Sequence, residues 1–337
     1  MRQWIIVILV VSFMVALGGC QKNGAEGVVV YTSHDQIYSE PVLKGFEEES
    51  GIRVRAVYDV EATKTTGIVN RLIAEKQNPR CDVFWNNEIG RTIILKRKGL
   101  LSPYRSPSAE DIPERFKDHE GYWTGFAARA RVIIYNKELV RPDEIPSSIF
   151  DLSKAPWQGQ FTIANPLFGT TATHAAALFA YLGDERAKKY FTDLKLNKVI
   201  IAQGNSVVKD QVATGEIKAG LTDTDDVNMA LLAGKPVGMV YPDQEGMGAL
   251  LIPNTVCLIA GSPNPEGGKK LIDYLLSREV ESRLSFSESA QVPLRTDIKK
   301  PDRVPSLSSI TSMDINYEKI ADRMEEAAVY LQKVFLQ

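Results

Sequence analysis

Short apolar runs of strand length alternate with helical patterns along the chain from Val28 onward. A short apolar run between turn signals is typical of a buried strand, and apolar positions at helical spacing predict a helix. In the first third of the chain, the expected strands are residues 28–31, 52–58 and 82–85, and the expected helices are residues 40–50, a segment around 68–73 and a segment ending at Lys98. This order predicts an α/β lobe with a largely parallel sheet.

The same alternation restarts after an apolar segment at residues 131–136. The expected elements of this second set are strands at residues 161–164, 199–202 and 220–222, and helices at residues 170–182, 184–194 and 206–214. We expect residues 237–242 to carry the chain back and residues 254–259 to rejoin the first sheet. Helices at residues 265–276 and 317–336 are expected to close the structure.

The restart of the pattern predicts a two-lobed α/β clamp with two hinge crossings and a central cleft. The first lobe is expected to contain residues 28–128 and 243–290, and the second lobe residues 129–242 and 291–337 with a closing C-terminal helix. The chain is long enough to give each lobe its own core. Because ligands of open α/β sheets bind beyond the carboxyl ends of the strands, the cleft is the expected binding site.

The N-terminus has the pattern of a secretion signal. Arg2 precedes an apolar stretch at residues 4–17 that is short for a membrane-spanning helix. Residues 17–20 read Leu-Gly-Gly-Cys, which resembles the site cut by the lipoprotein signal peptidase. We expect a lipoprotein signal peptide at residues 1–19, a lipid anchor on Cys20 and a polar tether at residues 20–27. The alternative is an ordinary cleaved signal, and both predict an extracytoplasmic protein, which the anchor would attach to a membrane.

Charge and cysteine content limit the class of protein. The chain has 40 basic and 42 acidic residues and no long basic run, so nucleic acid is not an expected partner. Cys81 and Cys257 are expected to be buried free thiols, with a disulfide as the alternative. The sequence contains no phosphate loop, no zinc-spaced His/Cys cluster and no nucleophile elbow. We therefore expect a protein that is not an enzyme and has no cofactor. We also expect a monomer.

Several segments, spread in order along the chain, are similar to one known family. They are residues 30–33, 82–88, 125–136, 156–159, 205–208, 252–256 and 271–277. In these segments the chain resembles the iron(III)-type extracellular solute-binding proteins of bacterial ABC importers. The resemblance implies a periplasmic binding protein-like fold, a permease and its ATPase as partners, and iron(III) or another metal as the transported ligand.

The chain departs from this family where ferric members hold their metal. Those members usually use two adjacent tyrosines, whereas residues 222–226 here read Thr-Asp-Thr-Asp-Asp. Ala128 stands where some members add another tyrosine. A second hypothesis therefore keeps the clamp and changes the ligand to an organic anion, such as a phosphonate, a sugar phosphate or a carboxylate. A third hypothesis is a sensor lipoprotein that presents its liganded form to a membrane receptor without transport.

Polar side chains follow each of the three strands expected in the first lobe. They are Ser33, His34 and Asp35 after the first strand, Glu61 after the second, and Asn87 and Glu88 after the third. Because the carboxyl ends of parallel strands meet at one edge of a sheet, we expect these side chains to face the cleft. Asp35 has a simpler alternative role as the cap of the next helix.

Residues of the second lobe and the crossing segment offer contacts for an anion. Thr170 and Thr171 open an expected helix, and the free N–H groups at such a helix start attract anions. Arg129 on the crossing segment has a guanidinium that can contact a phosphate or carboxylate through two hydrogen bonds. The alternatives are helix capping for the threonines and a hinge salt bridge for Arg129.

Acidic residues of the second lobe offer contacts for a cation. Asp223 and Asp225 are the expected ligands of a hard metal, and they could instead contact an ammonium group. The resemblance to ferric members implies Glu88 of the first lobe as a further metal ligand. Their alternative role is helix capping. Tyr241 is a further candidate, as a replacement for the missing tyrosines.

Overall fold

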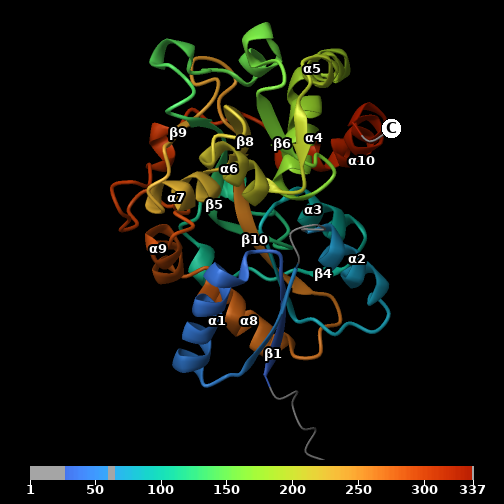
Figure 1. Cartoon of the computed structure of the whole chain (residues 1–337). Helices are drawn as coiled ribbons and strands as arrows, with labels where there is room; N and C mark the ends of the chain where they lie inside the picture. Colours follow the sequence, from blue (N-terminus) through green and yellow to red (C-terminus); the bar gives the residue numbers. More distant parts are fainter. Residues whose placement is uncertain (1–26, 60–64, 336–337) are drawn as a thin grey trace, which may run out of the picture.

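The structure is a computed structural model that describes residues 27–59 and 65–335. Its elements form two lobes, which the long strands β5 (Thr124–Asn136) and β10 (Leu251–Ile259) join (Figure 1). The predicted signal peptide, Cys20 and Glu61 lie outside the described residues. Short 3-10 helices occupy Pro107–Ala109, Glu114–Phe116, Pro142–Glu144, Ile149–Ser153, Ala155–Trp157 and Leu307–Ser309.

The first lobe, the lower one in Figure 1, is built on a sheet of order β2-β1-β3-β10, with β4 also paired to β10. Besides β10, the helices and strands of this lobe are β1 (Val28–Thr32), α1 (Gln36–Ser50), β2 (Val54–Tyr58), α2 (Thr66–Ala74), β3 (Val83–Asn86), α3 (Gly90–Arg97), β4 (Leu101–Ser102), α8 (Pro265–Leu275) and α9 (Arg278–Phe286). Val28 and Val30 of β1 pack into one core, while Val29 and Tyr31 pack into another. The continuous apolar run in β1 therefore reflects burial on both faces of the sheet.

The second lobe has a sheet of order β5-β8-β6-β7, with β9 also paired to β5. Its other elements are β6 (Phe161–Ala164), α4 (Gly169–Leu182), α5 (Asp184–Leu196), β7 (Ile200–Ala202), α6 (Asn205–Ala213), β8 (Ala219–Asp223), α7 (Thr224–Leu232) and β9 (Val237–Val240). Strands β6, β7 and β8 are parallel, so α4, α6 and α7 all begin at the same edge of this sheet.

Strand β5 belongs to both sheets and forms one hinge crossing. Its first half pairs with β10, and its second half, from Arg131 onward, pairs with β8 and β9. Ala127 has a positive φ of 39°, and the β5–β10 register shifts between Pro253 and Asn254. This irregularity bends the paired strands where they pass between the lobes.

The structure differs from the sequence-based expectation at residues 237–242. Residues Val237–Val240 form β9, which stays in the second lobe and pairs antiparallel with β5. The return to the first lobe is made by β10. The apolar run predicted a strand correctly, but it could not specify which sheet the strand joins.

The C-terminal helix α10 (Tyr317–Phe335) packs against α4 and α5 of the second lobe and also against α3 of the first. The predicted lobe boundaries stay a prediction, and two contacts bear on them. Asp243 accepts a hydrogen bond from Ser148 of the second lobe, and Arg295 forms an ion pair of 2.8 Å with Glu281 of α9. Asp243 was predicted in the first lobe and Arg295 in the second. Each of these contacts instead connects the residue to the other lobe.

The two cysteines among the described residues, Cys81 and Cys257, are buried free thiols, as expected. Burial raises the pKa of Cys257 and that of Cys81, so both thiols stay protonated. Within the two described ranges, none of the helices combines the length and the apolar character that a membrane span requires.

Candidate functional site

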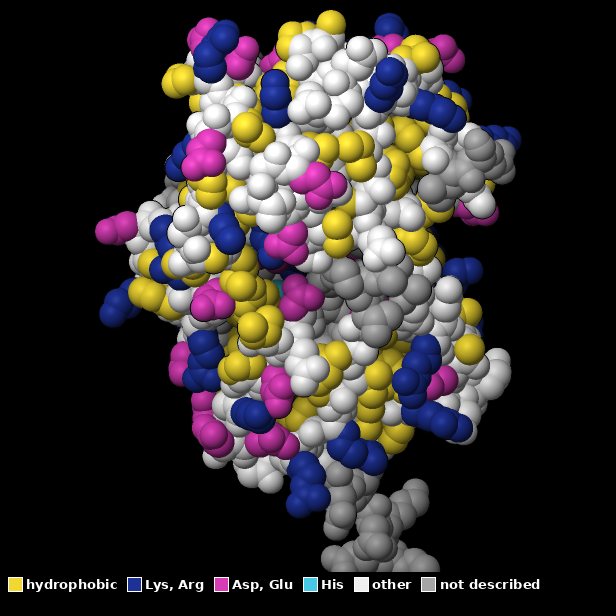
Figure 2. All heavy atoms as spheres, viewed as in Figure 1, with side chains coloured by type: hydrophobic (Ala, Val, Ile, Leu, Met, Phe, Trp, Pro, Cys, Tyr) yellow, Lys and Arg dark blue, Asp and Glu magenta, His cyan; other side chains and the backbone are white. Residues whose placement is uncertain are grey.

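A cavity of about 300 Å³ lies between the lobes, at the edge where the parallel strands end. The first lobe contributes the start of α1 and the loop after β3, and the second lobe contributes the starts of α4, α6 and α7. Figure 2 shows the groove between the lobes, with acidic side chains on both of its sides. Of the predicted site residues, those that line the cavity are Asp35, Asn87, Arg129, Thr170, Thr171, Asp223 and Asp225.

Two helices point their N-termini at this cavity without a side-chain cap. Helix α4 follows Phe168 and helix α6 follows Gly204, and neither residue has a side chain that can accept a capping bond. The first intrahelical donors are Ala172 and Val208, so the N–H groups of Thr170 and Thr171 in α4 and of Val207 in α6 have no partner within their helix. Both helix starts can therefore donate hydrogen bonds to a ligand in the cavity.

A buried aspartate joins these two helix starts. Both carboxylate oxygens of Asp223 accept hydrogen bonds: Oδ1 from Arg131 at 2.7 Å, and Oδ2 from Thr170 Oγ1 at 2.6 Å and Asn205 Nδ2 at 2.9 Å. Asn205 Nδ2 also donates to Thr170 Oγ1 at 2.9 Å, and Thr171 Oγ1 donates to Asn205 Oδ1 at 3.3 Å. The network connects the end of β8, the crossing strand β5 and the first turns of α4 and α6.

Arg129 lies on the crossing strand and is 2% exposed. Its Nη1 lies 3.1 Å from Asp225 and 3.8 Å from Asp223, and its Nη2 lies 3.3 Å from His34 Nδ1. Its buried Nε has no hydrogen-bond partner among the described residues. Burial lowers the pKa of Arg129, but the neighbouring carboxylates, Asp225 first, outweigh it and raise the pKa overall. The guanidinium therefore stays charged.

The predicted residues after β1 take different places. Asp35 precedes α1 and lines the cavity, and its side chain makes no capping bond. His34 is buried beside the Trp85 ring, with 5.2 Å between the ring centroids. Ser33 is buried beneath the loop after β3, where its hydroxyl donates to Asn86 Oδ1 at 2.7 Å and accepts from the Asn87 backbone at 3.0 Å. Ser33 thus fixes the loop that presents Asn87 to the cavity.

Glu88 is fully buried and connects the two lobes. Its Oε2 accepts a hydrogen bond from Thr173 of α4 at 2.8 Å, and its Oε1 accepts from Asn86 Nδ2 at 3.1 Å. The neighbouring Arg91 donates to the Leu167 carbonyl of the second lobe at 3.1 Å. Glu88 does not line the cavity, and its role as a metal ligand stays a prediction.

Tyrosines contribute little to this cavity. Tyr241 packs against a core of the second lobe and is not a lining residue, and burial raises its pKa to about 12. Tyr38 is the tyrosine among the described lining residues. Burial and then Asp225 and Asp35 raise the pKa of Tyr38, so its phenolate form is strongly disfavoured.

Three carboxylates of the second lobe lie close enough together for a metal. Oxygen atoms of Asp223, Asp225 and Asp226 lie within 4.8 Å of one another. Each carboxylate also has a partner in the protein: Arg131 for Asp223, Arg129 for Asp225, and the Thr222 hydroxyl at 2.8 Å for Asp226. A metal bound by all three would have to compete with two arginines.

Sequence reasoning missed Arg131 and Asn205 as members of this site. Alternate residues of a strand point to the same face, so Arg131 could have been paired with Arg129 from the spacing alone. Asn205 stands at the start of an expected helix after a strand, which is the same signal that identified Thr170.

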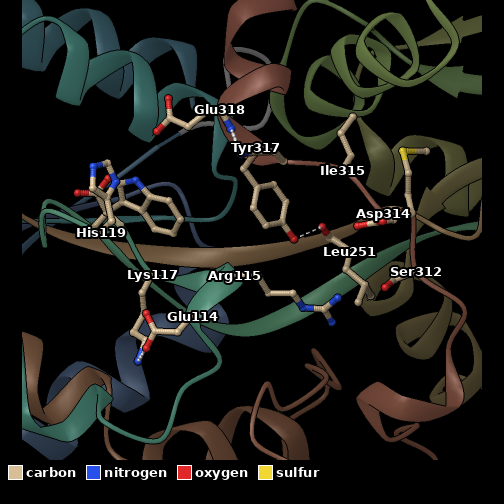
Figure 3. A pocket seen from close by; sticks show the side chains of 14 residues that line it. Glu114, Arg115, Lys117, His119, Leu251, Ser312, Asp314, Ile315, Tyr317 and Glu318 are labelled. Carbon is tan, nitrogen blue, oxygen red and sulfur yellow. Dashed lines mark hydrogen bonds and ion pairs between the residues drawn. The ribbon is translucent and has the colours of Figure 1, made fainter.

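A second cavity, of about 350 Å³, lies away from the cleft, beside the crossing strand β10 (Figure 3). Its walls come from residues 114–123 of the first lobe and residues 312–318 before and within α10. The Tyr317 hydroxyl donates to the Leu251 carbonyl at 3.0 Å, which is drawn as a dashed line in Figure 3. Tyr317 packs against cores of both lobes, so it connects α10 to the hinge.

Comparisons with known proteins identify relatives of this chain. Iron uptake protein A1 of Synechocystis sp. is 25% identical over 88% of this chain and 82% of its own length. The Fe(3+)-binding periplasmic protein of Serratia marcescens is 24% identical over 96% of this chain and 97% of its own. These matches confirm the resemblance found in the sequence.

Solved structures confirm the predicted two-lobed fold. A ferric binding protein from Campylobacter jejuni superposes with a TM-score of 0.82 and 24% identity, covering 91% of this chain and 99% of its own. The periplasmic binding protein AfuA from Actinobacillus pleuropneumoniae, with fructose-6-phosphate bound, gives a TM-score of 0.81 and 22% identity, covering 91% and 98%. The profile of one family matches residues 42–308, and the chain therefore belongs to the bacterial extracellular solute-binding proteins.

Proposed function

We propose that this protein is the solute-binding component of an ABC importer and that it captures a small organic anion, such as a sugar phosphate, a phosphonate or a carboxylate. The observation that carries the proposal is the convergence of two uncapped helix starts, α4 and α6, on the cavity that also contains Arg129. Both lobes line this cavity, so a ligand held there would contact both and favour the closed clamp.

Four aspartates line the cavity, but the part of its wall formed by the starts of α4 and α6 and by Arg129 suits an oxyanion. Each helix N-terminus carries a partial positive charge and presents N–H groups that lack intrahelical partners. The guanidinium of Arg129, which also lines the cavity, adds a cationic donor beside them. The hydroxyl of Thr171 adds another when it exchanges its bond to Asn205 for one to the ligand. A phosphate or carboxylate accepts several hydrogen bonds at once, so it can use donors from α4, α6 and β5 together.

The transport role rests on the family. An extracellular solute-binding protein of an importer delivers its ligand to a permease driven by an ATPase, and these are the partners that we propose. We also propose that a lipid on Cys20 tethers the clamp to a membrane, because residues 17–20 have the pattern of a lipoprotein cleavage site.

Iron(III) is the second candidate ligand. Two relatives are named as iron uptake or Fe(3+)-binding proteins, and the carboxylates of Asp223, Asp225 and Asp226 offer hard oxygen ligands. Against it, the described lining residues include one tyrosine rather than an adjacent pair, and arginines already hold Asp223 and Asp225. The geometry therefore favours the organic anion.

A thermal-shift screen tests the proposal. The mature chain carrying Cys20→Ser is heated with fructose 6-phosphate, 2-aminoethylphosphonate, methylphosphonate, citrate or ferric nitrilotriacetate. A ligand at about 100 times its Kd stabilises the folded state by about 2.7 kcal/mol, which raises the melting temperature measurably. We expect an organic anion to give the largest shift, and a shift with the ferric complex alone would contradict the proposal.

The matched variants are Thr171→Val and Thr214→Val. Thr171 lines the cavity, whereas Thr214 is exposed just past the end of α6. The first substitution should reduce the shift that the anion produces, and the second should leave it unchanged.

A further inference from the structure

Asp223 was expected to be a ligand of a cation, but its surroundings suit a different role. Its side chain is 1% exposed, and three hydrogen bonds occupy its two oxygens. Two of these bonds come from the first turns of two different helices: Thr170 is the second residue of α4, and Asn205 is the first residue of α6. A single carboxylate therefore fixes the distance between the two helix starts.

We infer that Asp223 is a positioning residue, which holds the N-termini of α4 and α6 so that both can donate to one bound anion. This inference rests on the proposed function. The cross-bond from Asn205 to Thr170 at 2.9 Å and the one from Thr171 to Asn205 at 3.3 Å reinforce the same arrangement. Without these bonds, each helix start could still attract an anion, but the two sets of N–H groups would not be held in register.

Arg131 makes this arrangement compatible with an anionic ligand. A buried aspartate next to the cavity would repel an anion and would itself be costly to bury. Arg131 is fully buried and its Nη1 lies 2.7 Å from Asp223 Oδ1, while its Nη2 donates to the Leu221 carbonyl at 3.2 Å. The paired guanidinium offsets the negative charge, so Asp223 can organise the helix starts without excluding the anion.

The positioning role and a purely electrostatic role predict opposite results. If Asp223 acted only through its charge, Asp223→Asn would remove a repulsive charge and strengthen the binding of an anion. If Asp223 positions the helix starts, the same substitution weakens binding, because an amide replaces one acceptor oxygen with a donor and disrupts the bonds from Thr170 and Asn205. Asp225→Asn is the comparison for charge alone, since Asp225 is also a buried cavity carboxylate, and its ion pair is with Arg129 of the crossing strand.

The experiment is a ³¹P NMR titration of the mature chain with inorganic phosphate as the probe. We expect Asp223→Asn to weaken phosphate binding by at least about tenfold, and Asp225→Asn to tighten it because a repulsive charge is removed. Tighter binding in both variants would overturn the positioning role. So would loss of ferric binding in Asp223→Asn with phosphate binding unchanged. Absence of phosphate binding in the unmodified chain would overturn the inference, while the proposed function would still be decided by the thermal-shift screen.

Thr170 keeps the inference testable if Asp223→Asn fails to fold. Thr170→Val removes the hydroxyl that donates to Asp223, and Thr170→Ser retains it. At equal melting temperatures, weaker phosphate binding in the valine variant with normal binding in the serine variant supports the positioning role. Phosphate binding by Thr170→Val that matches the unmodified chain would refute it.

Discussion

Replacing Arg129 by glutamine removes a buried positive charge from the centre of the cleft. The guanidinium Nη1 lies 3.1 Å from Asp225 Oδ2, and both side chains are almost fully buried. With an effective dielectric constant of about 20, Coulomb's law gives an attraction of about 5 kcal/mol for unit charges at this separation. Breaking a buried ion pair on one side typically costs about 3–5 kcal/mol, so we expect a loss of that size in the free energy of unfolding.

The matched variant is Arg129→Gln combined with Asp225→Asn, which removes both charges of the pair. Since the cost of the single change comes mainly from the carboxylate left buried without its guanidinium, the double variant should regain most of the lost stability. Urea unfolding followed by circular dichroism measures both values. If the double variant is as unstable as the single one, the ion pair does not account for the contribution of Arg129 to stability.

Binding should respond differently from stability. Both Arg129→Gln and the double variant lack the cationic donor that we assign to the anion, so both should lose about 2–5 kcal/mol of binding free energy, at least about thirtyfold in Kd. Calorimetry with the organic anion that gives the largest thermal shift measures this loss. Full affinity in the double variant would show that Arg129 is a hinge strut rather than a ligand contact.

Three further predictions follow from other parts of the chain. His174 is buried in α4, and burial, followed by the charge of Arg131, lowers its pKa well below 6.5. As the pH falls below about 6.5, His174 binds a proton in the unfolded state but not in the folded state. The free energy of unfolding therefore falls by at most about 1.4 kcal/mol per pH unit. In His174→Gln, urea unfolding at successive pH values should show a shallower fall, and an unchanged slope would contradict this. Tyr317→Phe removes the hydrogen bond to the Leu251 carbonyl and should cost about 1 kcal/mol, measured by urea unfolding; no loss would mean that water replaces the bond without cost. Cys20→Ser should release the folded clamp from membranes in cell fractionation, and a variant that stays membrane-bound after signal removal would disprove the lipid anchor.

The fold was largely predictable because its signals are local. The apolar runs at residues 28–31 and 82–85 and the glycine stop at Gly51 specify strands and a helix end wherever they occur. The first half of β5 was missed, since residues 124–130 are rich in small residues and contain an arginine. These residues are buried only because β10 and the segment at Val292 cover them, and that burial depends on the whole fold.

The candidate site was predictable in its position but not in its pairings. Strand ends of one sheet must meet at one edge, so the convergence of Asn87, Thr170 and Asp223 on a cavity could be expected. Which aspartate pairs with which arginine depends on how the side chains are oriented in the complete fold of both lobes. Glu88 shows the same limit, because its partner Thr173 lies 85 residues away on the other lobe.

The most direct test of the account is a calorimetric titration of the mature chain with fructose 6-phosphate and 2-aminoethylphosphonate in the presence of EDTA. A clamp whose cavity wall recognises the anion through helix N-termini and Arg129 needs no metal, so binding should occur with one site per chain and should be unaffected by the chelator. Thr171→Val should weaken that binding, and Thr214→Val should not. Binding that appears only when iron(III) is supplied, and that EDTA abolishes, would contradict the account and identify the metal as the ligand.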